Sequence, residues 1–245
     1  MTISSPHNDR LKEIRKLARR RSRDLTGRFV AEGEDLLAAA DAAGWPALER
    51  YCAAGSGLDG VEVEPELLDS VSQLGSGTRA LAVYEQRWAD APAGPLCVAL
   101  HGISDPGNVG TILRSALAFG ASSVALGPEC ADPFGSKAVR ASMGALFAVP
   151  LARCADAGEL PGTTVALDAH GGEPLADALA AVDGPLTLVV GAERAGLPAD
   201  VLAACDRTAR IPIASESLNA AMAATIALYE VTRGAVAAEH RMPPA

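Results

Sequence analysis

Apolar residues in the second half of the chain fall into short continuous runs separated by segments with helical spacing. The segments predict helices that begin near Val109, Lys137, Leu175, Pro198 and Ser217. The runs predict strands at residues 96–102, 123–127, 145–151, 163–169, 185–191 and 207–213. Strands that are apolar along their whole length and alternate with helices are typical of a parallel sheet covered on both faces. The pattern therefore predicts an α/β domain over residues 96–245.

The first part of the chain alternates in the same way on a smaller scale. Helices are predicted at residues 9–21, 34–44 and 64–75, and strands at 27–33, 48–55 and 79–86. Asn8 or Asp9 is suited to cap the first of these helices. Residues 88–95 are rich in proline, alanine and glycine without periodicity, which indicates a linker. We therefore expect a small α/β domain over residues 1–87, before the larger one.

The amino-acid composition limits the classes of protein to which this chain can belong. The chain has 245 residues, of which 49% are hydrophobic, so it can bury a substantial core. No apolar run is long enough to span a bilayer, and the N-terminus lacks the apolar stretch of a signal peptide. The five cysteines are dispersed, with no CxxC pair and no histidine at metal-binding spacing. These features predict a cytoplasmic protein with reduced, buried thiols and no metal site.

The net charge of −9 is unevenly distributed. Residues 1–28 contain nine basic and three acidic side chains, a net charge of +6, so the rest of the chain carries −15. A basic segment of this kind can bind phosphates, although a charged run is more often a solvated helix face. The charge pattern alone leaves both interpretations open. The side chains that would contact RNA under the first interpretation are Arg15, Lys16, Arg19, Arg20, Arg21 and Arg23.

Polar residues with unusual spacing follow two of the predicted strands. After residues 96–102 the chain reads ISDPGNVGTILRS, with Asn108 at or before a helix N-cap and Arg114 in the second turn. After residues 185–191 it reads AERAGLP, with Glu193 in a loop bounded by glycines. Ligands of an open parallel sheet bind at the carboxyl ends of its strands, where such loops lead into helices. Each loop alone fits an ordinary turn equally well.

A third loop leads into the last predicted helix and reads IPIASESLNAAMAATIALYE. Ser217 is suited to cap this helix, and Asn219 is unusual in its first turn. Alanines in the helix allow another helix to approach closely. An apolar stripe is formed by Leu218, Met222, Ile226 and Tyr229. The chain has neither a dinucleotide-binding fingerprint nor a P-loop, which argues against a nucleotide-dependent oxidoreductase.

The three loops, in this order and at these separations, resemble the SpoU (TrmH-like) family of RNA ribose 2′-O-methyltransferases in the SPOUT superfamily. The resemblance covers most of residues 96–236 and includes NVGTILRSALAFGASSVAL, ADPFGSKAVRASMGALFAVP, LVVGAERAGLP and the third loop. The phrases RKLARRRSRDLTGRFVAEGEDLL and GTRALAVYE resemble the ribosomal-protein-like substrate-binding domain that many members carry. With this resemblance, RNA binding becomes the favoured interpretation of the basic N-terminal segment.

For the fold, the resemblance implies a parallel sheet whose C-terminal segment threads a deep trefoil knot, which ordinary fold rules disfavour. It further implies that the knot binds S-adenosylmethionine, mostly through backbone groups, and that the two subunits of a homodimer combine to form each active site. The residues implied to line the cofactor pocket are Leu167, Gly191, Ile211 and Leu218. Only Ala-Ser-Glu separates IPI from SLN here, whereas the family usually has a longer connection, so we expect an altered pocket edge.

For the chemistry, the resemblance implies a catalytic set of Asn108, Arg114, Glu193, Ser217 and Asn219. The central role falls to Arg114, which some accounts of the family treat as a general base. Deprotonating an arginine at neutral pH costs about 7 kcal/mol, so we expect a cationic Arg114 that binds phosphate and eases ionisation of the 2′-hydroxyl. The asparagines would orient substrate or Arg114. Glu193 would hold the arginine or an asparagine, and Ser217 would brace the loop.

Three functions stay open. The first is ribose methylation of 23S ribosomal RNA, favoured by the added N-terminal domain. The second is transfer-RNA ribose methylation, which would use the same residues. The third is a catalytically silent RNA-binding protein, against which the five intact catalytic positions argue. DNA is excluded as a substrate because it lacks the 2′-hydroxyl. His101 and His170 lack partner patterns, and we expect structural or solvent-facing roles for them.

Overall fold

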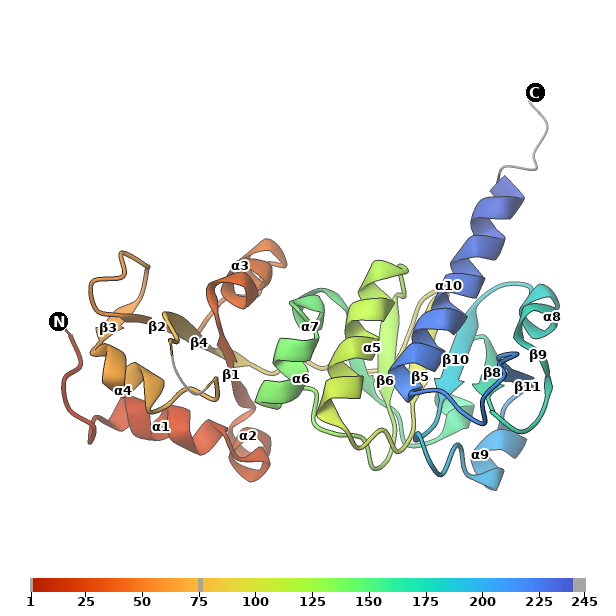
Figure 1. Cartoon of the computed structure of the whole chain (residues 1–245), viewed down its shortest axis with the longest axis horizontal. Coiled ribbons are helices and arrows are strands. Elements are labelled where there is room, and N and C mark those ends of the chain that lie inside the picture. The colour runs from red at the N-terminus through yellow and green to blue at the C-terminus, as the bar shows by residue number, and fades with distance from the viewer. Residues whose placement is uncertain (1, 75–76, 240–245) are drawn as a thin grey trace. The chain divides into compact units, whose positions relative to one another are not determined.

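The computed structural model describes residues 2–74 and 77–239, and side chains as far as residue 233. The chain divides into two compact units, each with its own sheet (Figure 1). Unit 1 comprises residues 1–87 and 132–148, and unit 2 comprises residues 88–131 and 149–245. The predicted α/β fold class is confirmed.

Unit 1 contains a four-stranded mixed sheet. Its strands, in the spatial order β1-β4-β2-β3, are β1 (Arg28–Glu32), β2 (Glu49–Ala53), β3 (Val61–Val63) and β4 (Ala80–Glu85). Its helices are α1 (Asp9–Leu17), α2 (Arg20–Thr26), α3 (Glu34–Ala42), α4 (Pro65–Asp69), α6 (Ser136–Ala141) and α7 (Ala145–Ala148). β4 pairs antiparallel with β1 and β2, and β3 pairs parallel with β2. The sequence pattern missed β3 because three residues do not complete a readable alternation.

The helix predicted over residues 9–21 is two helices. Asn8 caps α1, since its side chain accepts a hydrogen bond from the backbone N–H of Arg10 at 2.9 Å. The chain is extended at Arg19, and α2 then ends at Gly27, whose φ of 64° suits the left-handed cap position. The side chain of Arg23, in α2, stabilises the break between the two helices. The guanidinium of Arg23 donates to the carbonyl oxygens of Leu17 and Ala18, which the end of α1 leaves free.

Arg23 is a buried structural residue, with 6% of its surface exposed. Its guanidinium also forms an ion pair with Asp132 at 2.7 Å, and Asp132 lies 109 residues away in the sequence. A buried charge is tolerated only when it is paired and its hydrogen bonds are satisfied, which is the case here. The prediction that Arg23 contacts RNA is therefore wrong. The sequence of this arginine-rich segment does not indicate that Arg23 pairs with a residue far away in the chain.

The segment Asp132–Ala148 packs within unit 1, although it lies in the range predicted for the larger domain. Phe29 packs against Phe134 and Phe147 of this segment, with ring centroids 4.9 and 6.1 Å apart. The buried aromatic cluster of unit 1 consists of Phe29, Trp45, Tyr84, Phe134 and Phe147. No local pattern indicates this packing, because all of its contacts join segments distant in sequence. The domain boundaries at residues 87 and 96 themselves stay a prediction.

Unit 2 contains a seven-stranded sheet in which every pairing is parallel. The order is β7-β6-β5-β10-β8-β11-β9. The strands are β5 (Leu96–Leu100), β6 (Ser123–Leu126), β7 (Leu151–Arg153), β8 (Thr163–Leu167), β9 (Glu173–Pro174), β10 (Leu186–Val190) and β11 (Arg207–Arg210). The helices are α5 (Pro106–Ala118), α8 (Leu175–Ala180), α9 (Ala199–Ala204) and α10 (Ala220–Glu239), with a 3₁₀ turn at Ala157–Glu159. The central strands β5, β6 and β10 are buried at every position, as expected for a sheet covered on both faces.

One predicted strand is wrong. Residues 145–151 contain the short helix α7, and the strand β7 begins only at Leu151. A short apolar run does not distinguish a buried strand from a buried helix, and here the aromatic cluster of unit 1 takes up Phe147. The trefoil knot stays a prediction.

Helices α5 and α10 lie side by side in unit 2 (Figure 1). The hydroxyls of Ser115 and Thr225 join them at 2.7 Å. The buried alanines of α10 are Ala220, Ala221, Ala224 and Ala227, and their small side chains permit this close packing. Three of the four residues of the predicted apolar stripe face outward, whereas Leu218 is half-buried and lines a cavity. Met222, Ile226 and Tyr229 are 61%, 39% and 53% exposed.

The cysteines are free thiols, four of them buried and Cys205 half-buried. Burial raises the pKa of the Cys97, Cys130, Cys154 and Cys205 thiols. In the part of the chain that the structure describes, no helix has the length and apolar character needed to cross a bilayer. Nor do the described residues include a group of three or more His, Cys, Asp or Glu side chains placed to hold a metal ion.

Candidate functional site

A cavity of about 360 Å³ opens beside the carboxyl ends of β8, β10 and β11. Three stretches form its wall, namely the residues after β8, the loop after β10, and the connection from β11 into α10. Small-molecule sites usually occupy roughly 300–1,000 Å³ and lie at this edge of a parallel sheet. The cavity therefore has the size and the place of a site for a small molecule.

The structure brings the four predicted cofactor-binding residues into one wall. Leu167, Gly191, Ile211 and Leu218 all line the cavity. Leu167 and Gly191 stand at the ends of neighbouring parallel strands, which are paired in register up to Val190 and Leu167. Their contacts with a cofactor stay a prediction, but their convergence follows from the parallel sheet itself.

Gly191 occupies a position where no side chain fits. A Cβ atom there would lie 2.5 Å from the carbonyl carbon of Gly196 and 2.6 Å from the backbone nitrogen of Leu197. The loop folds back tightly because Gly196 adopts a φ of 66° and donates its N–H to the carbonyl of Ala192 at 2.9 Å. The cavity wall here is consequently backbone rather than side chain.

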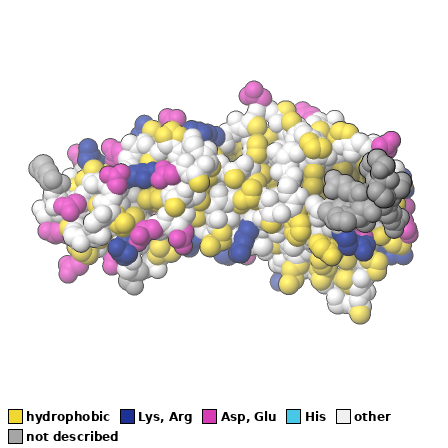
Figure 2. Space-filling view, turned by 90° about the horizontal axis from the view of Figure 1, so that it is seen from above, with side chains coloured by type: hydrophobic (Ala, Val, Ile, Leu, Met, Phe, Trp, Pro, Cys, Tyr) yellow, Lys and Arg dark blue, Asp and Glu magenta, His cyan; other side chains and the backbone are white. Residues whose placement is uncertain are grey.

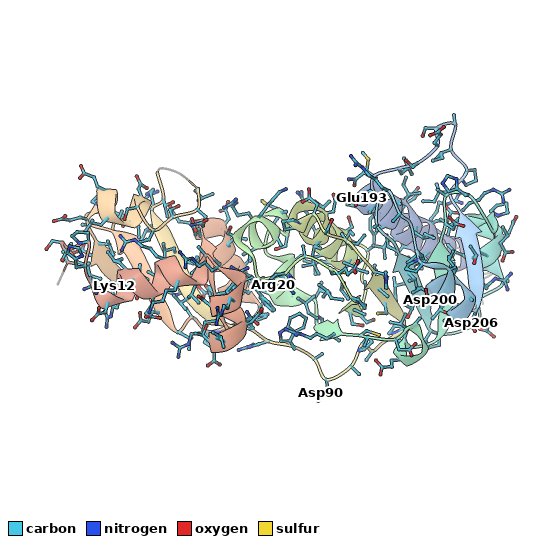
Figure 3. All side chains as sticks on the ribbon, turned by 90° about the horizontal axis from the view of Figure 1, so that it is seen from below. Lys12, Arg20, Asp90, Glu193, Asp200 and Asp206 are labelled. Carbon is cyan, nitrogen blue, oxygen red and sulfur yellow. The ribbon has the colours of Figure 1, made fainter. Side chains whose placement is uncertain are left out.

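The strands β8 and β11 are held in register by Asp206, which immediately precedes β11 (Figure 3). Its carboxylate accepts hydrogen bonds from both the backbone N–H and the hydroxyl of Thr164, each at 2.8 Å. These bonds lower the pKa of Asp206. They position the strand ends from which Leu167 and Ile211 line the cavity.

A polar network at the margin of the cavity joins the start of α5, the loop after β10 and the start of α10. The amide of Asn219 donates to the side-chain oxygen of Asn108 at 3.1 Å, and the amide of Asn108 donates to the carboxylate of Glu193. Glu193 lies in the loop after β10 and also lines the cavity (Figure 3). Its carboxylate therefore binds an asparagine, one of the two partners expected for it.

The helix caps in this region differ from the prediction. Asn219 caps α10, since its side-chain oxygen accepts from the N–H groups of Ala221 at 2.9 Å and Met222 at 3.3 Å. Ser217 is exposed, lines the cavity and does not cap the helix. Asn108 is likewise not a cap, because Asp105 caps α5 and Asn108 follows in the first turn. The capping role explains why an asparagine opens α10.

Arg114 stands apart from this network. Its side chain is exposed and forms no hydrogen bond or ion pair within the described part of the chain, and Arg114 does not line the cavity. Arg114 lies on the outer face of α5 with three other exposed residues, Thr111, Leu117 and Ala118. Six residues on a helix separate Asn108 from Arg114 by well over one turn, so the two side chains leave α5 in different directions.

Sequence reasoning missed four polar residues of the cavity wall, namely Asp168, His170, Arg194 and Glu216. A signal for the first two was present, because the segment DAH comes directly after β8, at the same sheet edge as the other loops. His170 is exposed, which agrees with the expected solvent-facing side chain, but it also faces a cavity.

The basic residues of unit 1 have different environments. Arg15 donates to the carbonyl of Pro6 and the hydroxyl of Ser70, each at 3.0 Å. Lys16 pairs with Glu13, and Arg20 lies 3.7 Å from Asp24. Arg19, Arg21 and Arg28 are exposed, and their guanidinium groups form no hydrogen bond or ion pair with any described residue. These last three are the cations of the basic segment that are free to bind an external anion.

Comparison with known proteins gives two family matches. The SpoU rRNA Methylase family matches residues 95–229, and the MRM3-like substrate binding domain matches residues 8–86. An uncharacterized tRNA/rRNA methyltransferase of Mycobacterium bovis is 38% identical over 175 residues, which cover 67% of this chain and 55% of that protein. The chain thus spans about half the length of several curated relatives that it matches.

Two further proteins match along nearly their whole length. The 23S rRNA (guanosine-2′-O)-methyltransferase RlmP of Bacillus subtilis is 27% identical, with 94% of this chain and 98% of that protein covered. The crystal structure of an AdoMet-bound rRNA methyltransferase from Sinorhizobium meliloti has a TM-score of 0.84 and 31% identity, with 99% of each chain covered. The residues that match the methylase family include all three stretches of the cavity wall, and the structural match covers almost the whole chain. The chain belongs to the SpoU rRNA methylase family.

Proposed function

We propose that this protein transfers a methyl group from S-adenosylmethionine to a ribose 2′-oxygen of 23S ribosomal RNA. The observation that carries the proposal is the Asn219–Asn108–Glu193 network at the rim of a cavity with a backbone wall. The B. subtilis relative, named as a 23S rRNA 2′-O-methyltransferase, supports the substrate class. A ribosomal substrate and free thiols favour a cytoplasmic location.

The cavity fits the proposed cofactor. The loop at Gly191 presents backbone groups, and apolar side chains of Leu167, Ile211 and Leu218 complete the wall, as a purine and a thioether chain require. When bound, the cofactor supplies a methyl group on a positively charged sulfur. The AdoMet-bound relative from S. meliloti, with a TM-score of 0.84, supports this assignment.

The residues at the rim would position the nucleotide. Glu193, which lines the cavity, accepts a hydrogen bond from the amide of Asn108 and so restricts the orientation of the Asn108 side chain. Holding the ribose in line with the donor removes much of the entropic barrier to transfer. A guanidinium stays protonated at neutral pH, so Arg114 would bind the flanking phosphate and stabilise negative charge on the 2′-oxygen. The proton would leave to phosphate or water.

Arg114 would act in the cavity of a second copy. It lies on the outer face of α5, and α5 packs against α10, which carries exposed apolar residues. Hydrophobic side chains gather on the surface of unit 2 in Figure 2. Packing of this face against the same face of a second subunit would bury Leu117, Met222 and Tyr229 and carry each Arg114 across the interface.

Labelled methyl transfer tests the proposed function. Ribosomal and transfer RNA from cells that lack this protein are offered separately with labelled S-adenosylmethionine. Label in 23S RNA is the expected result, and label in transfer RNA alone would favour the second candidate substrate. Absence of label in both, together with no cofactor binding, would contradict an enzymatic role and favour a silent RNA-binding protein.

Replacing Gly191 by alanine is expected to lower the affinity for S-adenosylmethionine by at least about tenfold. The new methyl group would lie 2.5 Å from the backbone of Gly196, so the loop must move out of its position in the cavity wall. Isothermal titration calorimetry measures the change. Gly158→Ala is the matched control, because its Cβ has only an ordinary 3.5 Å neighbour and Gly158 lies outside the cavity wall. Equal affinity of both variants would contradict the assigned pocket.

Met222→Glu is expected to convert a dimer into a monomer of 25.0 kDa. Burying an unpaired carboxylate in the interface costs about 3 kcal/mol or more. Light scattering during gel filtration measures the mass. The control is Met143→Glu, a methionine of similar exposure, 58% against 61%, that belongs to unit 1. A monomeric wild type with full activity would contradict the shared active site.

A further inference from the structure

Leu25 is the most exposed of the large hydrophobic side chains that the structure describes, with 77% of its surface accessible. It lies on α2, in the basic part of unit 1. Of the other exposed large hydrophobic residues, Leu117, Met222 and Tyr229 already have a proposed role in unit 2. A single exposed leucine is common on protein surfaces and would need no explanation by itself. Its surroundings make this one different.

Two arginines whose guanidinium groups have no described partner lie close to Leu25 along the chain. Arg21 is one helical turn earlier on the same face of α2, at the i−4 position. Arg28 follows the Gly27 cap, three residues after Leu25. Neither guanidinium group has a hydrogen-bond or ion-pair partner among the described residues. The one carboxylate of α2, Asp24, lies against Arg20 instead.

Contacts of a buried side chain fix the position of α2. Arg23 anchors the helix through Asp132 and the carbonyls of Leu17 and Ala18. The N–H of Gly27 bonds to the carbonyl of Arg23 at 2.8 Å and closes the helix. Leu25 is therefore presented on a rigid support, which lowers the entropy lost when a partner binds.

We propose that Leu25, with Arg21 and Arg28, forms a contact for an unpaired base in structured RNA. This inference rests on the proposed function and specifies which feature of the RNA unit 1 recognises. The leucine would pack on the face of a base that has left its stack, while the guanidinium groups bind the adjacent phosphates. A protein partner fits less well, because a protein interface needs a contiguous apolar patch, and here an isolated apolar group stands among cations.

The test measures RNA affinity by fluorescence anisotropy with the full chain over a series of salt concentrations. Two RNA probes of equal length are used, a 23S fragment with hairpin loops and bulges, and a perfect duplex. Leu25→Ala is expected to weaken binding of the looped RNA by about five- to tenfold, with the salt slope and duplex affinity unchanged. Arg21→Ala is expected to weaken both RNAs and reduce the salt slope by about one.

Leu48→Ala is the matched control, since Leu48 is an exposed leucine of the same unit and is expected to leave both affinities unchanged. Wild-type affinity of Leu25→Ala for the looped RNA would overturn the inference, and so would an equal loss on both probes. If the wild type binds neither probe, the proposed function fails as well, so the two failures are distinguishable. Circular dichroism verifies that each variant is folded.

Discussion

Replacing Arg114 by alanine is expected to abolish methyl transfer while S-adenosylmethionine still binds with wild-type affinity. The loss of a cation aimed at developing charge costs at least about 10²- to 10³-fold in rate. Cofactor affinity should be retained because Arg114 does not line the cavity of its own chain, and in the cavity of the second copy it would bind the RNA phosphate rather than the cofactor. Single-turnover methyl transfer at saturating RNA, paired with calorimetry of cofactor binding, separates the two effects.

Two further variants sharpen this result. Arg114→Lys keeps the charge but loses the planar pair of donors, so it should recover only part of the rate. Arg79→Ala removes another exposed arginine, one that pairs with Glu34 in unit 1, and should retain the wild-type rate at saturating RNA. Substantial turnover by Arg114→Ala would contradict the assigned role. So would a loss of cofactor binding that accounts for the whole defect.

Arg23→Ala is expected to lower the free energy of unfolding of unit 1 by about 3–5 kcal/mol. The substitution leaves the carboxylate of Asp132 without its cation in an environment where the pair is nearly inaccessible, and it frees two carbonyls at the end of α1. Hydrogen exchange of the β1 and β4 amides measures the stability of this unit directly.

Arg21→Ala is the matched comparison for stability. Arg21 is two residues away, exposed and unpaired, so its removal should change stability by less than about 0.5 kcal/mol. Asp132→Ala should resemble Arg23→Ala, and the double variant should be less destabilised than the sum of the two. Equal stability of Arg23→Ala and Arg21→Ala would mean that the ion pair does not support the fold.

The pattern of apolar residues predicts much of this fold because it acts locally. Buried parallel strands such as β5 and β10 are apolar at each position, and the helices between them have clear starts, so both kinds of element are readable. The pattern is misleading where a distant partner decides the structure. Phe147 reads as part of a strand, yet it lies in a short helix because the rings of unit 1 bury it.

The candidate site is predictable to a similar degree. The family resemblance names four residues that converge on one cavity, and three of the five residues that it implies to be catalytic share one hydrogen-bond network. Neither source indicates that Asn219, rather than Ser217, caps α10, because both residue types suit that position. The sequence also does not indicate the direction in which the Arg114 side chain points, because that direction depends on which face of α5 is buried.

The segment Asp132–Ala148 affects how this protein can be modified or recombined. The chain leaves unit 2 after β6, contributes Phe134 and Phe147 to the core of unit 1, and returns to form β7. Deleting residues 1–87 would therefore strip these rings of their partners and leave an apolar surface prone to aggregation. A transplant of the N-terminal unit to another methyltransferase would need residues 132–148 to travel with it. Evolutionary exchange of substrate-binding modules in this chain must respect the same inserted segment.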